Sequence, residues 1–232
     1  MSIEIVDLVS VRRLIAVGVQ LVEVLPADEY EELHLPGAIN IPLKQLDAES
    51  VKRLDHRRDT VVYCWDQLCD MSPRAAHRLT SLGFSRVYDY AASKVDWLAH
   101  GLPAEGTAAD RPTAGSLARD DAATCALDTT AGEALAMIAE SPYGFALATN
   151  ADGVLLGRVR RSTLETVTGE RAVEAILEPG PSTIRPHEAV AELRARLERP
   201  DVRTLVVTRP DGTLVGVVPR EDIPRSPQLD PD

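Results

Sequence analysis

Hydrophobic and polar positions follow two different patterns along the first half of the chain. Short runs rich in β-branched residues predict buried strands, and segments with apolar residues at helical spacing predict helices. The predicted strands are 21–25, a short strand within 34–42, 61–64 and 87–90. The predicted helices are 9–17, a short turn at 28–32, 47–54, 73–82 and 94–100. Because strands and helices alternate, the pattern predicts an α/β fold with a parallel sheet and helices on both faces.

The second half of the chain repeats one pattern of hydrophobic and polar positions. Residues 145–159 align with residues 204–218, and each stretch reads as a strand, an Asp-Gly turn and a second strand. A helix of matching phase precedes each hairpin, at 131–139 and 188–197. A period of roughly sixty residues of this kind indicates a duplicated α+β module whose two copies stack sheet to sheet.

A small, polar segment broken by glycine and proline separates the two halves, which is typical of a linker between domains. The end of the chain is polar and contains proline, so we expect a disordered tail. The predicted organisation is an α/β domain over 1–106, a linker over 107–116, a first repeat over 117–169, a second repeat over 170–225 and a tail over 226–232.

Composition and charge limit the classes of partner. The chain has 232 residues, 44% hydrophobic and 26% charged, which suits a globular protein with two modest cores. Its net charge of -11 disfavours nucleic acids and anionic membranes, since both select basic surfaces. Apolar runs are too short to cross a membrane and the first residues lack a signal-peptide pattern, so we expect a cytoplasmic protein.

The cysteines do not form a structural framework. Cys64, Cys69 and Cys125 are too few and too unevenly spaced for a disulfide scaffold. Cys64 and Cys69 with His77 supply fewer than the four ligands of a structural zinc site, so no metal is expected. Cys125 lies on the first β segment of the repeat, where we expect it to be buried and inert.

Cys64 is the candidate nucleophile. It ends an apolar strand and is followed by a polar loop and by Ser72-Pro73. Ser72 is a suitable helix cap, Pro73 suits the first helical position, and Gly83 is expected to end the helix. The helix N-terminus would then favour the thiolate of Cys64 over the thiol. The alternative is an inert cysteine at the end of a buried strand.

Several segments within residues 5–105 match the pattern of one known family. They are Glu29-Tyr30, the run from His34 to Pro42, Val62-Tyr63-Cys64, Ala75-Ala76, Leu82-Gly83-Phe84, Trp97 and Gly101-Leu102-Pro103. With these segments the chain resembles the rhodanese family. The resemblance implies a sulfurtransferase or persulfide carrier that requires no cofactor. Cys64 would take a sulfane sulfur from a donor and pass it to a thiophilic acceptor, with proteins among the candidates for both. The loop that would hold the persulfide comprises Trp65, Asp66, Gln67, Leu68, Asp70, Met71 and Ser72.

Three departures from that family pattern affect the expected activity. Residues 23–25 read Glu-Val-Leu where the family usually has Asp-Val-Arg, and 91–92 are Ala-Ala where it usually has Gly-Gly. The loop is longer than usual, carries Asp66 and Asp70, and lacks the arginine that a phosphatase-type loop needs to clamp a dianion. We therefore predict weak activity with thiosulfate and a preference for a persulfide donor.

Two neighbours of Cys64 admit alternative roles. Cys69 either attacks the Cys64 persulfide and leaves a disulfide between the two, or only fills a turn of the loop. His34 is expected to order its turn by bonding the backbone rather than to act as a general base. Two other functions stay open: a non-catalytic, partner-binding regulator, and a thiol redox sensor in which Cys64 and Cys69 form a bridge on oxidation.

Residues 114–224 resemble a pair of CBS domains, the Bateman module. The resemblance implies an adenosine-containing ligand between the copies, such as AMP, ATP or S-adenosylmethionine, and a homodimer formed through the pair. Of the family's Gly-x-x-Thr-x-x-Asp motif, residues 216–222 keep the acid, Asp222, and residues 157–163 lack both the threonine and the acid. One nucleotide site using Asp222 is therefore expected, and a scaffold without a ligand is the alternative. Arg158, Arg160 and Arg161 are candidates for contact with phosphates, and the alternative is that they are solvated or paired to acids.

Overall fold

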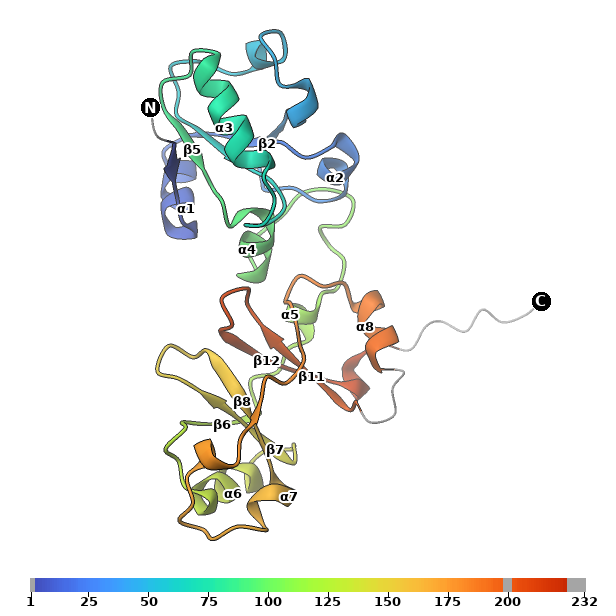
Figure 1. Ribbon diagram of the computed structural model, residues 1–232. Coiled ribbons are helices and arrows are strands. Elements are labelled where there is room, and N and C mark those ends of the chain that lie inside the picture. Colours follow the sequence, from blue (N-terminus) through green and yellow to red (C-terminus); the bar gives the residue numbers. More distant parts are fainter. Residues whose placement is uncertain (1–2, 198–201, 225–232) are drawn as a thin grey trace, which may run out of the picture. The chain divides into compact units, whose positions relative to one another are not determined.

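The chain forms two compact units, Met1–Arg111 and Pro112–Asp232, which we call the N-terminal and the C-terminal unit. A computed structural model describes residues 3–197 and 202–224 of the chain (Figure 1). The boundary between the units falls within the predicted linker. The predicted disordered tail, 226–232, lies outside the described residues.

A five-stranded parallel sheet forms the centre of the N-terminal unit, in the order β1-β5-β4-β2-β3. The central strand, β4, is buried at all four of its positions, which explains its continuous apolar run. The predicted α/β class with a parallel sheet is therefore confirmed. The strands are β1 (Glu4–Ile5), β2 (Gln20–Glu23), β3 (Ile39–Asn40), β4 (Thr60–Tyr63) and β5 (Val87–Asp89).

Helices cover both faces of this sheet because successive side chains of β4 point to opposite sides. Val62 and Cys64 belong to one apolar cluster, which includes the buried face of α3. Val61 and Tyr63 belong to a second cluster, which includes Trp97 of α4. The helices are α1 (Leu8–Ala16), α2 (Ala27–Glu32), α3 (Met71–Ser81) and α4 (Ser93–Ala99).

Two details of the N-terminal unit differ from the sequence-based expectation. The predicted helix over 47–54 is wrong: the chain forms only a short 3-10 turn there, η2 (Ser50–Arg53), after another one, η1 (Leu43–Gln45). The Asp47 carboxylate accepts the N–H groups of Glu49 and Ser50, and such local bonds compete with a regular helix. Strand β1 was missed, because two residues are too few to show a period.

The C-terminal unit contains two small sheets, in the orders β6-β7-β8-β9 and β10-β11-β12. Their strands are β6 (Ala123–Cys125), β7 (Phe145–Thr149), β8 (Leu155–Arg160), β9 (Glu178–Pro179), β10 (Thr183–Ile184), β11 (Thr204–Thr208) and β12 (Leu214–Pro219). The helices and 3-10 turns are α5 (Ala114–Leu117), α6 (Ala131–Ala139), α7 (Arg161–Leu164), η3 (Val173–Ala175), α8 (Val190–Leu197) and η4 (Arg220–Asp222).

The start of α6 follows from a local sequence signal. Thr130 accepts the N–H of Glu133 through its hydroxyl, and the Glu133 carboxylate accepts the N–H of Thr130. This reciprocal capping box satisfies two N–H groups that a helix otherwise leaves free. The helix then buries Ala134 and Ile138 against the sheet, as the helical spacing predicts.

The two predicted hairpins are present and share one register. Both are antiparallel, both turn at a glycine with a positive φ, Gly153 at 77° and Gly212 at 87°, and both shift register at the matching position. The two turns exchange backbone hydrogen bonds, from Leu155 N–H to the Gly212 carbonyl and from Leu214 N–H to the Gly153 carbonyl. A shared apolar cluster lies between the sheets, so the copies stack as predicted. Its buried members are Leu147, Val206 and Val217.

Within residues 3–197 and 202–224, no helix is both long and apolar enough to span a bilayer. Over the same residues, histidine, cysteine and acidic side chains do not gather in groups of three that could ligate a metal ion.

Candidate functional site

Cys64 lies directly after β4, at the carboxyl end of the central strand. Its backbone is held on both sides by the first residues of α4. The Cys64 N–H donates to Oγ of Ser93 at 3.0 Å, and the Cys64 carbonyl accepts the N–H of Lys94 at 3.3 Å. The side chain is buried. The end of the strand is thus fixed by a helix that begins roughly thirty residues later in the chain.

The Cys64 sulfur is surrounded by oxygen atoms. Sγ lies 3.4 Å from Oγ of Ser72, 3.7 Å from Oγ of Ser93 and 3.5 Å from the carbonyl of Cys69. Burial raises the pKa of the Cys64 thiol, and the Ser72 and Ser93 hydroxyls only partly offset that effect. In this conformation the Cys64 thiol contacts the Cys69 carbonyl, and burial opposes the activation expected from the helix.

Helix α3 begins one residue before the predicted cap. Asp70 occupies the N-cap position without a side-chain capping bond, and Met71 is the first helical residue. Ser72 is therefore inside the first turn, and its buried hydroxyl faces the Cys64 sulfur instead of capping the helix. The prediction that Ser72 caps the helix is wrong, whereas Gly83 follows the helix end with a φ of 95°, as expected.

Asp66 closes the loop after Cys64. Its carboxylate accepts the N–H groups of Leu68 and Cys69, both at 3.0 Å. Two backbone amides of the loop that would hold a persulfide are therefore bonded within the loop. Asp70 is exposed and lies 3.4 Å from Arg74 in the next turn. Of the two acids in the loop, only Asp66 contributes to the loop geometry.

The rest of the loop presents apolar side chains to solvent. Trp65 is 38% exposed and Leu68 is 88% exposed, while Gln67 between them is also exposed. Cys69 and Met71 are half-buried and pack against the apolar cluster that contains Cys64. Cys64 and Cys69 are both free thiols.

A buried ion pair lies beside this loop. The Lys94 ammonium donates to the Glu23 carboxylate at 2.7 Å, and both side chains are fully buried. It also donates to the carbonyl of Leu33 and lies 5.7 Å from the centre of the Trp65 ring. Burial raises the pKa of Glu23, and the attraction of Lys94 opposes that shift. The sequence offered no partner for Glu23, because Lys94 is remote from it in the chain.

Ser93 has a strained backbone. Its φ of 59° makes it the one residue other than glycine with a positive φ among the described residues. Its hydroxyl accepts the Cys64 N–H and donates to the carbonyl of Tyr90 at 2.8 Å. The same hydroxyl hydrogen is within reach of the Cys64 sulfur. Such strain persists only where the surroundings hold it, and here it places a hydroxyl beside the candidate nucleophile.

His34 is held by its own turn. Its Nδ1 lies 2.6 Å from the carbonyl of Tyr30, its ring stacks on the Tyr30 ring at 3.7 Å, and its Nε2 lies 3.4 Å from the Glu105 carboxylate. Its backbone also pairs with that of Glu105. These contacts order the turn.

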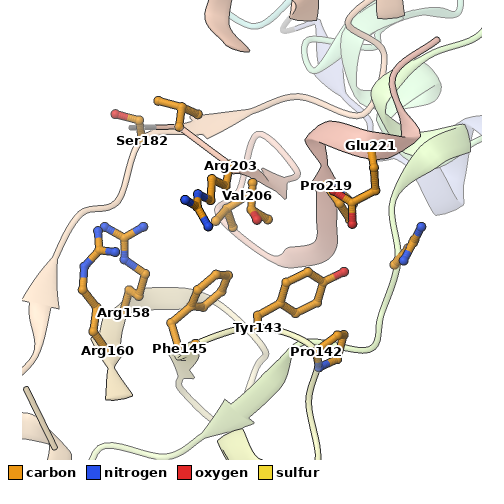
Figure 2. Close-up of a pocket in the computed structure, with 14 residues that line it drawn as sticks. Pro142, Tyr143, Phe145, Arg158, Arg160, Ser182, Arg203, Val206, Pro219 and Glu221 are labelled. Atoms are coloured by element: carbon orange, nitrogen blue, oxygen red, sulfur yellow. The ribbon is translucent and has the colours of Figure 1, made fainter. Parts of the chain in front are cut away.

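The C-terminal unit has a cleft of about 730 Å³ between its two copies (Figure 2). Aromatic residues of the first copy form one wall, where the Tyr143 and Phe145 rings stack at 5.6 Å and the Arg158 guanidinium lies 5.9 Å from the Phe145 ring. Sequence reasoning missed both aromatic residues, because Phe145 begins an ordinary strand and Tyr143 lies in the bend just before it. The lining residues are Arg119, Pro142, Tyr143, Gly144, Phe145, Arg158, Arg160, Ser182, Val202, Arg203, Thr204, Val206, Pro219 and Glu221.

The charged groups around the cleft are partly paired. Arg158 and Arg160 both bind the Glu178 carboxylate, at 2.9 and 2.8 Å. Burial raises the pKa of Glu178, whereas the two arginines lower it by a larger amount, so the net shift of this pKa is downward. Asp222 does not line the cleft. Its carboxylate pairs with Arg119, and Arg119 is one of the lining residues.

The third arginine singled out from the sequence has a structural contact. Arg161 donates to the carbonyl of Ile138 at 3.3 Å, at the end of α6. The hydroxyl of Tyr143 donates to Asp121 at 2.9 Å. Burial and this acid raise the pKa of Tyr143 to about 12.

Two family models match the chain. The model of the rhodanese-like domain matches residues 9–100, and the model of the CBS domain matches residues 173–226. The chain thus contains a rhodanese-like domain and a CBS domain. The CBS match covers the second copy of the repeat, and the first copy has a hairpin of the same register.

One curated relative and two solved structures illustrate these similarities. The HTH-type transcriptional regulator Rv0324 of Mycobacterium tuberculosis is 38% identical over 96 residues, which are 40% of this chain and 41% of that protein. This chain thus spans less than half the length of that relative. The NMR structure of a rhodanese-like domain from Anabaena sp. is 24% identical, with a TM-score of 0.42, over 48% of this chain and 84% of the other. The crystal structure of CBSX2 in complex with AMP is 20% identical, with a TM-score of 0.44, over 48% of this chain and 92% of the other.

Proposed function

We propose that the rhodanese-like domain carries a sulfane sulfur as a persulfide on Cys64. The observation that carries this proposal is the pair of hydroxyls, of Ser72 and Ser93, that lie 3.4 and 3.7 Å from the sulfur at the N-terminus of α3. Both hydroxyls favour an anionic sulfur, since each can donate to it. They stabilise the Cys64 thiolate, which attacks the donor and is released again when the acceptor takes the outer sulfur.

The transfer of sulfur from a donor persulfide to Cys64 needs no external oxidant. Cys64 attacks the outer sulfur of a donor persulfide, forming a new sulfur–sulfur bond at Cys64 while the donor's sulfur–sulfur bond breaks. The proton of the Cys64 thiol leaves with the donor thiol. A thiophilic acceptor later attacks the outer sulfur and returns Cys64 to its thiol form. Sulfur at the zero oxidation level moves unchanged between carriers.

Burial of the sulfur favours a carrier over a rapid thiosulfate enzyme. Cys64 is buried, its pKa is raised, and Asp66 holds two loop amides. Loading therefore requires the loop to release those amides, and a dianion such as thiosulfate also meets the Asp66 carboxylate. We expect slow loading from thiosulfate and faster loading from an uncharged or monoanionic persulfide donor.

Intact-protein mass spectrometry tests this function. Wild type, Cys64→Ser and Cys69→Ser are each exposed to thiosulfate and, separately, to cysteine persulfide. We expect a one-sulfur adduct that Cys64→Ser alone loses. Its absence from the wild type with both donors would refute sulfur carriage. A Cys69→Ser variant that keeps the adduct longer than the wild type would assign Cys69 to attack on the persulfide.

The geometry also supports a second candidate, a regulator that binds a partner without transferring sulfur. The neutral Cys64 thiol and the amides occupied by Asp66 favour it. One relative is by name a transcriptional regulator, although it matches over only part of its length. A redox sensor is the related alternative, because the Cys64 thiol already contacts the Cys69 carbonyl. Mapping a Cys64–Cys69 disulfide after mild peroxide, with no persulfide formed, would favour the sensor.

For the C-terminal unit we propose an adenosine-containing ligand in the cleft between the two copies. The cleft volume of about 730 Å³ is within the range of ligand pockets, and its aromatic wall suits a planar base. Calorimetry with AMP, ATP and S-adenosylmethionine tests this, and no heat from any of them at millimolar concentration would favour the scaffold instead. We also expect a homodimer through this unit, which light scattering would measure.

A further inference from the structure

The charges around the cleft are unevenly distributed. Arg158 and Arg160 share one carboxylate, that of Glu178, so this group keeps one net positive charge. Arg203 adds another, since it has no ion-pair partner among residues 3–197 and 202–224. In Figure 2 the side chain of Arg203 lies above Phe145, on the side of Arg158 and Arg160. One end of the cleft therefore carries about two positive charges.

The other end of the cleft is different. Glu221, Pro219 and Pro142 lie there in Figure 2, at the far side of the aromatic wall from Arg158 and Arg160. The remaining arginine of the lining, Arg119, is neutralised by Asp222. The cleft thus combines a cationic end, an aromatic middle and an end with the Glu221 carboxylate, which has no ion-pair partner within the described ranges.

We propose that this cleft selects a nucleoside polyphosphate, with its phosphates at Arg158, Arg160 and Arg203 and its base against Phe145 and Tyr143. This deepens the ligand proposal made above and rests on it. Arginine forks bind phosphate oxygens with charge-assisted hydrogen bonds, and the shared Glu178 keeps two of the forks in place. Each added phosphate charge then increases the attraction.

The same charges disfavour S-adenosylmethionine. Its sulfonium and amino groups give it a net positive charge, which the arginine end repels. Asp222 does not counter this repulsion, because Arg119 already pairs with it. Of the three candidate ligands, ATP fits the charges best, AMP fits less well and S-adenosylmethionine fits worst.

Calorimetry on the full chain tests the selection. ATP, ADP, AMP, adenosine, S-adenosylmethionine and inorganic tripolyphosphate are titrated at low and at moderate salt. We expect ATP to bind at least about tenfold more tightly than AMP, with an affinity that falls as salt rises. Arg203→Gln is expected to weaken ATP about tenfold while changing adenosine little. Arg171→Gln is the matched control, since Arg171 is exposed and does not line the cleft.

The outcomes separate the two proposals. Equal affinities for ATP, AMP and adenosine, or binding of S-adenosylmethionine as tight as that of ATP, would overturn the selection for polyphosphates while leaving the cleft a ligand site. Loss of ATP affinity in Arg171→Gln equal to that in Arg203→Gln would overturn it as well, because the effect would then follow net charge alone. No binding by any adenosine compound would overturn both proposals.

Discussion

Replacing Ser93 separates backbone strain from the contact with the sulfur. Ser93→Ala and Ser93→Gly both remove the hydroxyl that accepts the Cys64 N–H and lies 3.7 Å from Sγ, but only glycine adopts a φ of 59° without strain. A residue other than glycine in this region costs about 1–2 kcal/mol. The glycine variant should therefore be more stable than the alanine variant by about 1 kcal/mol.

The stability of either variant relative to the wild type combines two effects of opposite sign. Each variant loses the bonds to the Cys64 N–H and the Tyr90 carbonyl, and a buried unpaired N–H costs about 1–3 kcal/mol. The glycine variant is relieved of the backbone strain, so we expect its stability to be close to that of the wild type. The alanine variant keeps the strain and should be clearly less stable. In a domain of this size, 1 kcal/mol corresponds to a difference in Tm of about 4–8 °C.

Two measurements complete the comparison. Urea unfolding gives the stabilities, and alkylation at Cys64 as a function of pH, followed by peptide mass spectrometry, gives the apparent pKa of the thiol. Both variants should have a higher Cys64 pKa than the wild type and take up sulfur from a persulfide donor more slowly, because a donor to the Cys64 thiolate is gone. An alanine variant as stable as the glycine variant would refute the strain argument. An unchanged alkylation profile in both would refute the role of the hydroxyl.

Three further predictions follow from other contacts. Lys94→Met leaves Glu23 buried without its partner, so urea unfolding should show a free energy of unfolding lower by about 3–5 kcal/mol. The double variant with Glu23→Gln should lose less stability than the sum of the losses in the two single variants. Burial holds the pKa of Cys64 above that of a free thiol, so the folded state binds this proton more tightly than the unfolded state does. The free energy of unfolding should therefore carry the full contribution of this group below the unfolded pKa and lose it as pH rises through the folded pKa. The Cys64→Ser variant should lack this pH dependence. Gly157→Ala should destabilise the C-terminal unit and weaken ATP binding, because a Cβ there would lie 2.7 Å from the Glu178 carbonyl; unchanged unfolding of that variant would contradict the close approach of β8 and β9.

The features that sequence predicted best depend on neighbours in the chain. The apolar run of β4, the helical spacing of α6 and the Asp-Gly turns are local signals, and each produced the expected element. The position of Cys64 at the end of its strand follows from the same kind of signal.

The features that sequence missed depend on residues far apart in the chain. Lys94 meets Glu23 only because α4 returns across the sheet, and the strain at Ser93 has no signature in its residue type. The burial of Cys64, which decides the protonation of its sulfur, results from packing around the whole loop. Local capping rules also misassigned Ser72, since its hydroxyl is used by the sulfur.

The tips of the two hairpins behave unlike ordinary turns. Exposed turns generally tolerate inserted residues. Here the Gly153 and Gly212 carbonyls each accept an N–H from the other copy, so lengthening either turn would remove two backbone bonds at once. The duplicated halves therefore cannot diverge freely in turn length, and a change in one copy is expected to persist in evolution only with a compensating change in the other.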